Sequence, residues 1–133
     1  HTNTHAAHKN SVAGGAIDVT MYPDVTELYL AADVMITDFS SVMFDYTVTG
    51  KPILFLAPDL ERYRAERGFY FDFENTSPGP ILMSDDEVLQ ALGRIEQVSK
   101  LYEKRYREWQ KKFDSLEDGK AASRVVARVW GSN

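Results

Sequence analysis

The chain has 133 residues, of which 44% are hydrophobic and 26% are charged, a balance typical of one soluble globular domain. Its 15 basic and 20 acidic residues give a formal net charge of −5, which argues against a general nucleic-acid-binding protein. The absence of cysteine excludes disulfides and thiolate metal sites, and no segment has the roughly 20 apolar residues of a membrane-spanning helix.

The first elements in chain order predict a strand, a helix and a second strand. Residues 16–19 are typical of a short strand. Asp24 can cap a helix over about 25–32, with Leu28 and Ala31 or Ala32 on its inner face. The compact apolar run at 34–37 then predicts a buried parallel strand.

The next elements repeat this alternation. A helix is expected over about 41–48, ended by Gly50, and a buried strand over 52–56. Asp59 then precedes a short helix that runs to about residue 66. Strands that alternate with short helices indicate βαβ units and a mostly parallel sheet.

The rest of the chain predicts a turn-rich loop at 75–80 and then helices. Ser84 and Glu87 form a capping-box pattern, ahead of a helix with Val88, Leu92 and Ile95 facing inward. A longer helix is expected over about 100–113, and a last one after Gly119. Both carry apolar stripes that favour core packing: Tyr102, Tyr106, Trp109 and Phe113 on one, and Val125, Val126, Val129 and Trp130 on the other.

These elements predict an α/β fold, a partial Rossmann-like parallel sheet with flanking helices. We divide one truncated domain, 1–133, into a polar loop (1–15), a βαβ core (16–83) and carboxyl-terminal helices (84–133). A complete nucleotide-binding domain of this kind has further strands before residue 16, and the chain opens at His1 rather than at methionine. We therefore expect an excised part of a longer protein. Its open sheet edge can support a homodimer.

The segment 37–46 carries the most chemistry. A buried strand ends at Thr37 and a helix begins close behind it, and ligands of open α/β sheets bind beyond such strand ends. Ser40 and Ser41 add hydroxyl groups suited to a phosphate, and Asp45 can accept hydrogen bonds from a ribose diol. The alternative interpretation is plain helix capping, because Asp and Ser are favoured caps whatever the function.

Several linked motifs resemble the CDP-glycerol:poly(glycerophosphate) glycerophosphotransferase family over about residues 18–127. They are Asp24–Asp33, Ile36–Asp45, Gly50–Pro52, Arg67–Phe73, Pro78–Pro80 and Asp118–Ser123. Phe39 departs from the family pattern, in which tyrosine is common. The resemblance implies the carboxyl-terminal half of a GT-B type donor-binding domain in a bacterial transferase. Such an enzyme moves glycerol phosphate from CDP-glycerol to a growing teichoic-acid-type polymer and releases CMP.

The resemblance also implies roles for single residues. Ser40, Ser41 and Asp38, with Arg67, are assigned to the donor phosphates, and Asp45, followed by Gly50-Lys51-Pro52, to the ribose. His1 matches a catalytic histidine of the family if an arginine once preceded it; the alternative is a loop or tag histidine. No metal and no cofactor are expected, since CDP-glycerol is a substrate. The base, and the polyglycerophosphate or lipid-linked acceptor, belong to an amino-terminal domain outside this chain, so we expect the chain alone to be inactive.

Weaker patterns remain. Arg62 and Arg64 follow a strand end and can reach phosphates, although a surface position is the commoner outcome. His5 and His8 have metal-ligand spacing but no third ligand. The basic residues of 100–112 can bind an anionic membrane surface, which would place the protein peripherally on the cytoplasmic face of the bacterial membrane. The alternative is an ordinary solvated helix face.

Two other functions stay open. A nucleotide-sugar glycosyltransferase or epimerase has the same architecture, and the donor can carry glycerol, ribitol or a sugar. A receiver-like signalling module would use Asp38 as phosphoacceptor, but the acidic pair and the lysine that it needs are not visible.

Overall fold

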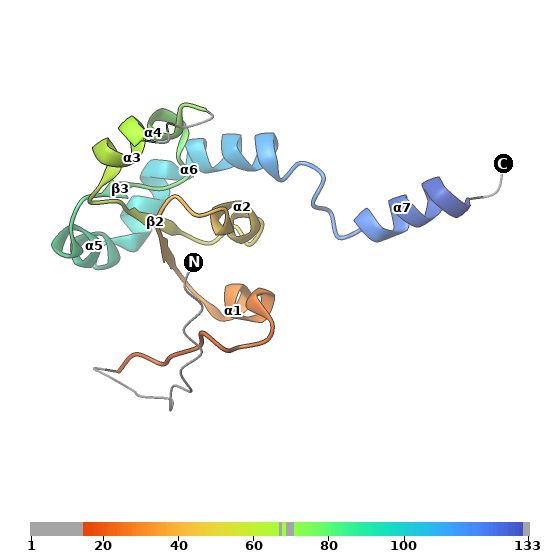
Figure 1. The fold of residues 1–133 in the computed structure, drawn as a ribbon, viewed down its shortest axis with the longest axis horizontal. Helices are drawn as coiled ribbons and strands as arrows, with labels where there is room; N and C mark the ends of the chain where they lie inside the picture. The colour runs from red at the N-terminus through yellow and green to blue at the C-terminus, as the bar shows by residue number, and fades with distance from the viewer. Residues whose placement is uncertain (1–14, 67, 69–70, 132–133) are drawn as a thin grey trace.

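The computed structural model describes residues 15–66, 68 and 71–131, and shows a small parallel sheet flanked by helices (Figure 1). The elements are α1 (Val25–Ala31), β1 (Met35–Thr37), α2 (Val42–Thr47), β2 (Ile53–Leu56), α3 (Leu60–Glu66), α4 (Phe73–Thr76), β3 (Ile81–Leu82), α5 (Asp85–Leu92), α6 (Ile95–Phe113) and α7 (Ala121–Trp130). His1, His5, His8 and Arg67 lie outside the described residues.

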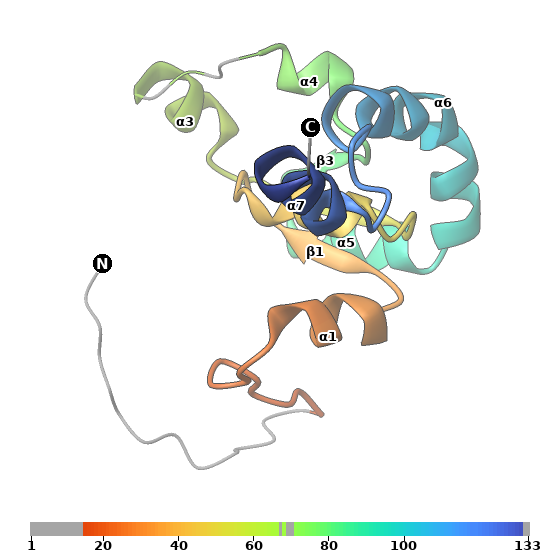
Figure 2. The same cartoon turned by 90° about the vertical axis from the view of Figure 1, so that its right-hand side faces the viewer.

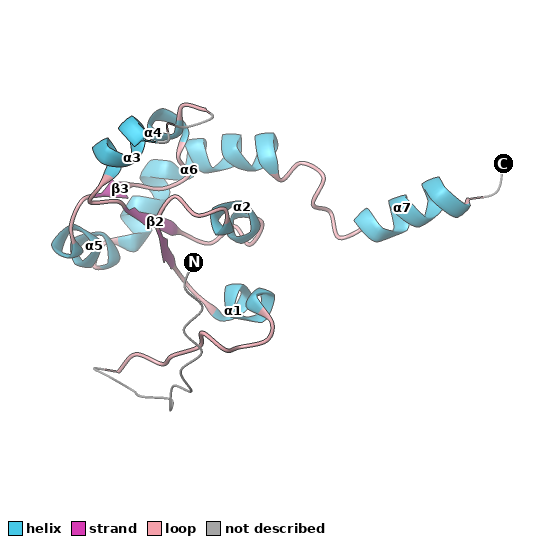
Figure 3. Ribbon diagram, in the orientation of Figure 1, coloured by secondary structure: helices cyan, strands magenta, loops and turns pink. Residues whose placement is uncertain are grey.

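The sheet has three strands in the order β1-β2-β3, and both neighbouring pairs are parallel (Figure 3). Met35 pairs with Ile53, and Phe55 pairs with Ile81. Parallel neighbours need a crossover, which α2 supplies between β1 and β2, and α3 with α4 between β2 and β3. The predicted βαβ organisation is therefore confirmed for this part of the chain.

The central strand β2 divides the core into two layers. Ile53 and Phe55 face one side and join a cluster with α2, Phe73 and Trp109 of α6. Leu54 faces the other side and packs against Val88 and Ala91 of α5. Because successive side chains of a strand alternate between its faces, the four residues Ile53–Leu56 can serve both layers.

The local signals that set the helix ends are confirmed. Asp24 caps α1 by accepting a hydrogen bond from the Thr26 backbone N–H at 2.8 Å. Ser84 Oγ accepts from the Glu87 N–H at 3.3 Å, and Glu87 Oε2 accepts from the Met83 N–H at 2.6 Å, a reciprocal arrangement close to the predicted capping box. Gly50 ends the turn after α2 with φ +73°, a conformation that glycine adopts readily.

Three expectations about elements are wrong, and one strand was not predicted. Residues 16–19 form no strand and are exposed: Ala16 makes an isolated β-bridge, and residues 17–19 have no regular structure. The helix expected from about Lys100 begins at Ile95, which belongs to α6 and not to the preceding helix. The loop expected at 75–80 begins with the end of α4, whose Phe73 fills the core. The short strand β3, Ile81–Leu82, was not predicted at all.

Two further differences concern burial. Ile36 of β1 is 47% exposed although a buried strand was predicted, because α5 packs on β2 and β3 and leaves that face of β1 open. On α7 the whole apolar stripe is exposed, and Figure 1 shows the helix apart from the sheet at the end of its connector. In Figure 2, turned by 90°, α7 lies in front of the sheet. The expectation for the first helix holds in one of its two forms: Leu28 and the C-cap residue Ala32 are half-buried, whereas Ala31 is exposed.

Candidate functional site

The loop between β1 and α2, residues 38–41, lies at the carboxyl end of β1. The Ser40 backbone N–H donates to Asp38 Oδ1 at 2.8 Å, which closes a tight turn directly after the strand. Asp38 is exposed and Ser40 is half-buried. The Asp38 carboxylate therefore stabilises the backbone conformation of the loop. Within the predicted site this is a structural role.

Ser41 is the N-cap residue of α2, but its side chain makes no capping hydrogen bond. The hydroxyl group is exposed, as is Asp45 four residues later. Residues four apart lie on the same helix face, so the two side chains present a hydroxyl and a carboxylate from one exposed surface. Plain capping, the alternative interpretation for Ser41, is not what its side chain does.

The faces of α2 that carry Phe44 and Thr47 are held by α6. The ring of Phe44 stacks on Trp109 with centroids 5.3 Å apart and an interplanar angle of 18°. Gln110 Nε2 donates to the Thr47 carbonyl at 2.8 Å, which satisfies a backbone acceptor at the end of the helix. The exposed face with Ser41 and Asp45 is therefore carried by a helix whose buried face is fixed.

Lys51 connects the carboxyl end of α1 with α6. Its Nζ donates to the carbonyls of Leu30 and Ala32 at 2.6 and 2.8 Å, at the carboxyl end of α1. The Lys51 carbonyl in turn accepts from the Tyr106 hydroxyl at 2.7 Å. A cation there suits the negative end of the helix dipole. No sequence pattern indicated these long-range contacts, since the partners lie about 20 and 55 residues apart in the chain.

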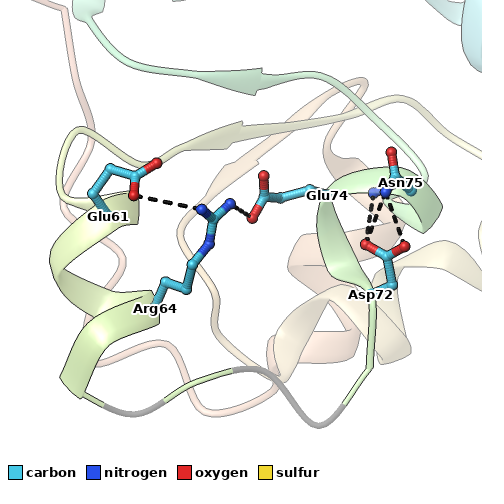
Figure 4. Close-up of polar contacts among 5 residues, drawn as sticks. All are labelled: Glu61, Arg64, Asp72, Glu74 and Asn75. Carbon is cyan, nitrogen blue, oxygen red and sulfur yellow. Dashed lines mark hydrogen bonds and ion pairs between the residues drawn. The ribbon is translucent and has the colours of Figure 1, made fainter.

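Arg62 and Arg64, which follow the end of β2, were candidates to reach the donor phosphates. Arg64 of α3 forms ion pairs with Glu74 of α4 and, at 3.5 Å, with Glu61 (Figure 4). Its guanidinium group therefore ties α3 to α4. In the same view Asp72 caps α4 by accepting from both nitrogen atoms of Asn75. Arg62, on α3 like Arg64, is exposed.

Asp114, the C-cap residue of α6, places a partly buried carboxyl group near Thr47 of α2. Within the described part of the chain its Oδ2 is buried without a hydrogen-bond partner. Burial raises the pKa of this carboxyl, a hydrogen bond with Thr47 opposes the rise, and the nearby carboxylates of Glu117 and Asp45 add to it. The folded chain therefore binds this proton more tightly than the unfolded chain does.

Replacing Asp114 by asparagine is expected to raise the melting temperature at neutral pH. The pKa of the Asp114 carboxyl is higher in the folded chain than in the unfolded chain. The group therefore adds to the stability of the fold at pH values below its pKa in the unfolded chain. That contribution is lost as the pH rises through its pKa in the folded chain. The asparagine removes the charge and its penalty, so its advantage shrinks on acidification. Thermal unfolding of both proteins, followed by circular dichroism from acid to neutral pH, measures this; an advantage that is constant with pH would contradict it.

A hollow of 630 Å³ lies away from this surface, between α6 and the loops that precede β2 and β3. Among residues 15–66, 68 and 71–131 no group of three potential metal ligands comes together. No described helix is both long and apolar enough to cross a membrane. The basic side chains of α6 are exposed, and two of them form surface ion pairs, Arg107 with Glu103 and Lys104 with Glu108.

Known proteins resemble the chain in sequence and in fold. The chain is 40% identical over 118 residues to a teichoic acid poly(glycerol phosphate) polymerase of Bacillus subtilis (strain 168), covering 88% of this chain and 16% of that protein. It is 40% identical over 114 residues to a teichoic acid glycerol-phosphate transferase of Staphylococcus aureus (strain NCTC 8325 / PS 47), covering 85% and 29%. The chain thus spans less than a third of these relatives.

A solved structure shares both the fold and the sequence. A wall teichoic acid polymerase TagF variant soaked with CDPG matches with a TM-score of 0.76 and 37% identity, over 82% of this chain and 27% of that one. This match confirms the predicted α/β fold as part of a GT-B type enzyme. The family model for CDP-glycerol:poly(glycerophosphate) glycerophosphotransferases matches residues 1–131. The chain belongs to the CDP-glycerol:poly(glycerophosphate) glycerophosphotransferase family.

Proposed function

We propose that this chain supplies part of the donor-binding domain of a transferase that moves glycerol phosphate from CDP-glycerol to a teichoic-acid-type polymer. Family membership supports the reaction class, and the TagF variant soaked with CDPG supports the donor. In this reaction an acceptor hydroxyl attacks the phosphorus that carries glycerol. The bond from that phosphorus to the bridging oxygen breaks, CMP leaves, and the hydroxyl proton passes to a base outside this chain.

The exposed surface of α2 carries the proposal. Ser41 occupies the N-cap position without using its side chain as a cap, and Asp45 is exposed one turn further along. We assign the hydroxyls of Ser40 and Ser41 to the donor pyrophosphate and the Asp45 carboxylate to the ribose diol. Hydroxyl donors aimed at a pyrophosphate position the donor and offset charge, and phosphoryl transfer depends on both effects. Arg67 and His1 stay predictions for the same site.

Calorimetric titration of the chain with CDP-glycerol, CDP-ribitol, CMP and UDP-glucose tests this assignment. We expect the cytidine ligands to bind in preference to UDP-glucose. Asp45→Asn and the double variant Ser40→Ala/Ser41→Ala should each weaken CDP-glycerol binding by about 10- to 100-fold, since hydrogen bonds to charged groups contribute about 1.5–3 kcal/mol. Asp45→Asn should weaken cytidine as well, whereas the serine variant should not.

The control is Asp86→Asn, which removes an exposed carboxylate from the first turn of a different helix, α5. Its affinity for CDP-glycerol should equal that of the unaltered chain. Binding that is absent for every nucleotide, or equal for CDP-glycerol and UDP-glucose, would contradict the assignment. An Asp45→Asn variant with unchanged affinity would remove Asp45 from the site while leaving the serines in it.

A further inference from the structure

Phe39 lies in the 38–41 loop, and its side chain packs against the main core cluster. Asp38 and Ser41, at the two ends of the loop, are exposed, whereas Phe39 and Ser40 are half-buried. Its ring meets that of Phe73 edge to face, with centroids 5.7 Å apart and an interplanar angle of 85°. This geometry is a favoured one for two aromatic rings. The loop with the proposed phosphate ligands is thus attached to the core through an aromatic side chain.

The partner of Phe39 is itself immobilised. Phe73, the first residue of α4, is only 1% exposed, and its ring meets that of Phe55 at 4.9 Å and 90°. Phe55 lies in the central strand and is fully buried. The Arg64–Glu74 ion pair ties α4 to α3 from the outside (Figure 4). A side chain that packs on Phe73 is therefore fixed relative to the sheet.

From these contacts we infer that Phe39 is a positioning residue for the donor. Its ring holds the 38–41 loop against α4 and so fixes where the hydroxyls of Ser40 and Ser41 stand. The inference rests on the proposed function and adds to it a residue that touches no ligand. Two contacts then fix the position of the loop. The Asp38–Ser40 hydrogen bond fixes the backbone conformation at its start, and the contact of Phe39 with Phe73 fixes the loop relative to the core.

A purely structural part for Phe39 predicts a different result. If the ring only fills space, its removal lowers the stability of the whole chain and weakens every ligand alike. If it positions the loop, its removal acts on the phosphate part of the donor and spares the nucleoside part. The comparison of CDP-glycerol with cytidine, which lacks phosphate, separates the two.

The test uses Phe39→Leu, which keeps apolar bulk, and Phe39→Ala. Phe113→Leu is the matched control, because Phe113 is a half-buried ring of the same cluster and lies on α6, outside the loop. We expect both Phe39 variants to bind CDP-glycerol about tenfold more weakly or worse, since small misplacements of binding groups are costly, and to bind cytidine as before. Phe113→Leu should leave the ratio of the two affinities unchanged. Equal losses for both ligands in Phe39→Leu would overturn the inference.

Amide hydrogen exchange supplies a readout that needs no ligand. The Phe44 and Met43 amides donate to Ser41 and Ser40 carbonyls at 3.1 and 3.3 Å, so they report on the loop. We expect them to exchange faster in Phe39→Leu while amides of α5 keep their rates. Unchanged rates at both amides would overturn the inference. If the unaltered chain binds no cytidine ligand, the proposed function fails, and these exchange rates alone decide whether Phe39 holds the loop.

Discussion

The chain with alanine in place of Gly79 is expected to lose its cooperative unfolding transition, or to lose more than about 3 kcal/mol of stability. A Cβ atom at this position would stand 1.9 Å from the Ile53 carbonyl oxygen and 3.0 Å from its carbonyl carbon. Both are backbone atoms of the central strand, so no flexible side chain can give way. Gly79 belongs to the loop that leads into β3, and relief of the clash would separate β3 from β2.

Urea unfolding followed by circular dichroism measures this effect, with Gly93→Ala as the matched control. At Gly93 the added Cβ would meet only the Leu89 and Gln90 carbonyl oxygens, at ordinary contact distances of 3.5 and 3.7 Å. Its φ of −62° suits any residue. Alanine there should stabilise the chain by about 0.4–1 kcal/mol, because the unfolded state loses freedom. Equal midpoints for the two variants would show that the loop before β3 yields easily.

The second large effect is expected at Trp109, whose replacement by alanine should cost about 3–5 kcal/mol. Trp109 is 2% exposed and lies among the rings of Phe44, Phe71, Phe73 and Phe113. Trp109→Phe should cost far less, because it keeps a ring and removes an indole N–H that has no partner within the described residues.

Urea unfolding of the two Trp109 variants beside Leu101→Ala decides this prediction. Leu101 belongs to the same helix but is 78% exposed, so its truncation should change stability by no more than about 0.5 kcal/mol. The expected order of stability is Leu101→Ala, then Trp109→Phe, then Trp109→Ala. A Trp109→Ala variant as stable as Leu101→Ala would mean that the aromatic cluster contributes little to folding.

Much of the fold could be predicted because its signals are local. Asp24, the Ser84–Glu87 pair and Gly50 each act within a few residues of their own position, and each does in the structure what its type predicts. The run at 52–56 is apolar on both faces, and β2 is buried on both faces. Where an element depends on nearby residues alone, sequence and structure agree.

The predictions were wrong where the structure of an element depends on contacts with segments that are distant in the sequence. Residues 16–19 have the composition of a strand, but a strand also needs a run of pairing partners along its length. Of these four residues Ala16 alone is in a β-bridge. The stripe on α7 has the period of a packed helix, but periodicity carries no information about which surface covers it. The short strand β3 has two residues, too few to give a pattern of its own, and forms because β2 offers it an edge.

The candidate site divides in the same way. The sequence indicated Ser40, Ser41 and Asp45 from their place after a strand end, and the structure puts them there. It could not show that Ser41 leaves its hydroxyl unused as a cap, nor that Arg64 is committed to Glu74. The contacts of Gln110 with Thr47, and of Phe39 with Phe73, join segments 63 and 34 residues apart, which no local motif encodes.

The contrast in burial between the two tryptophans gives the protein an intrinsic pair of optical reporters. Trp109 lies in a dry aromatic environment, and Trp130, at the end of α7, is 70% exposed. Indole emission shifts to longer wavelength in water, so Trp109 emits toward the blue and Trp130 toward the red. With Trp130 replaced by phenylalanine, fluorescence follows the unfolding of the core alone. With Trp109 replaced instead, a blue shift reports the moment at which any surface covers α7, without a label or a known ligand.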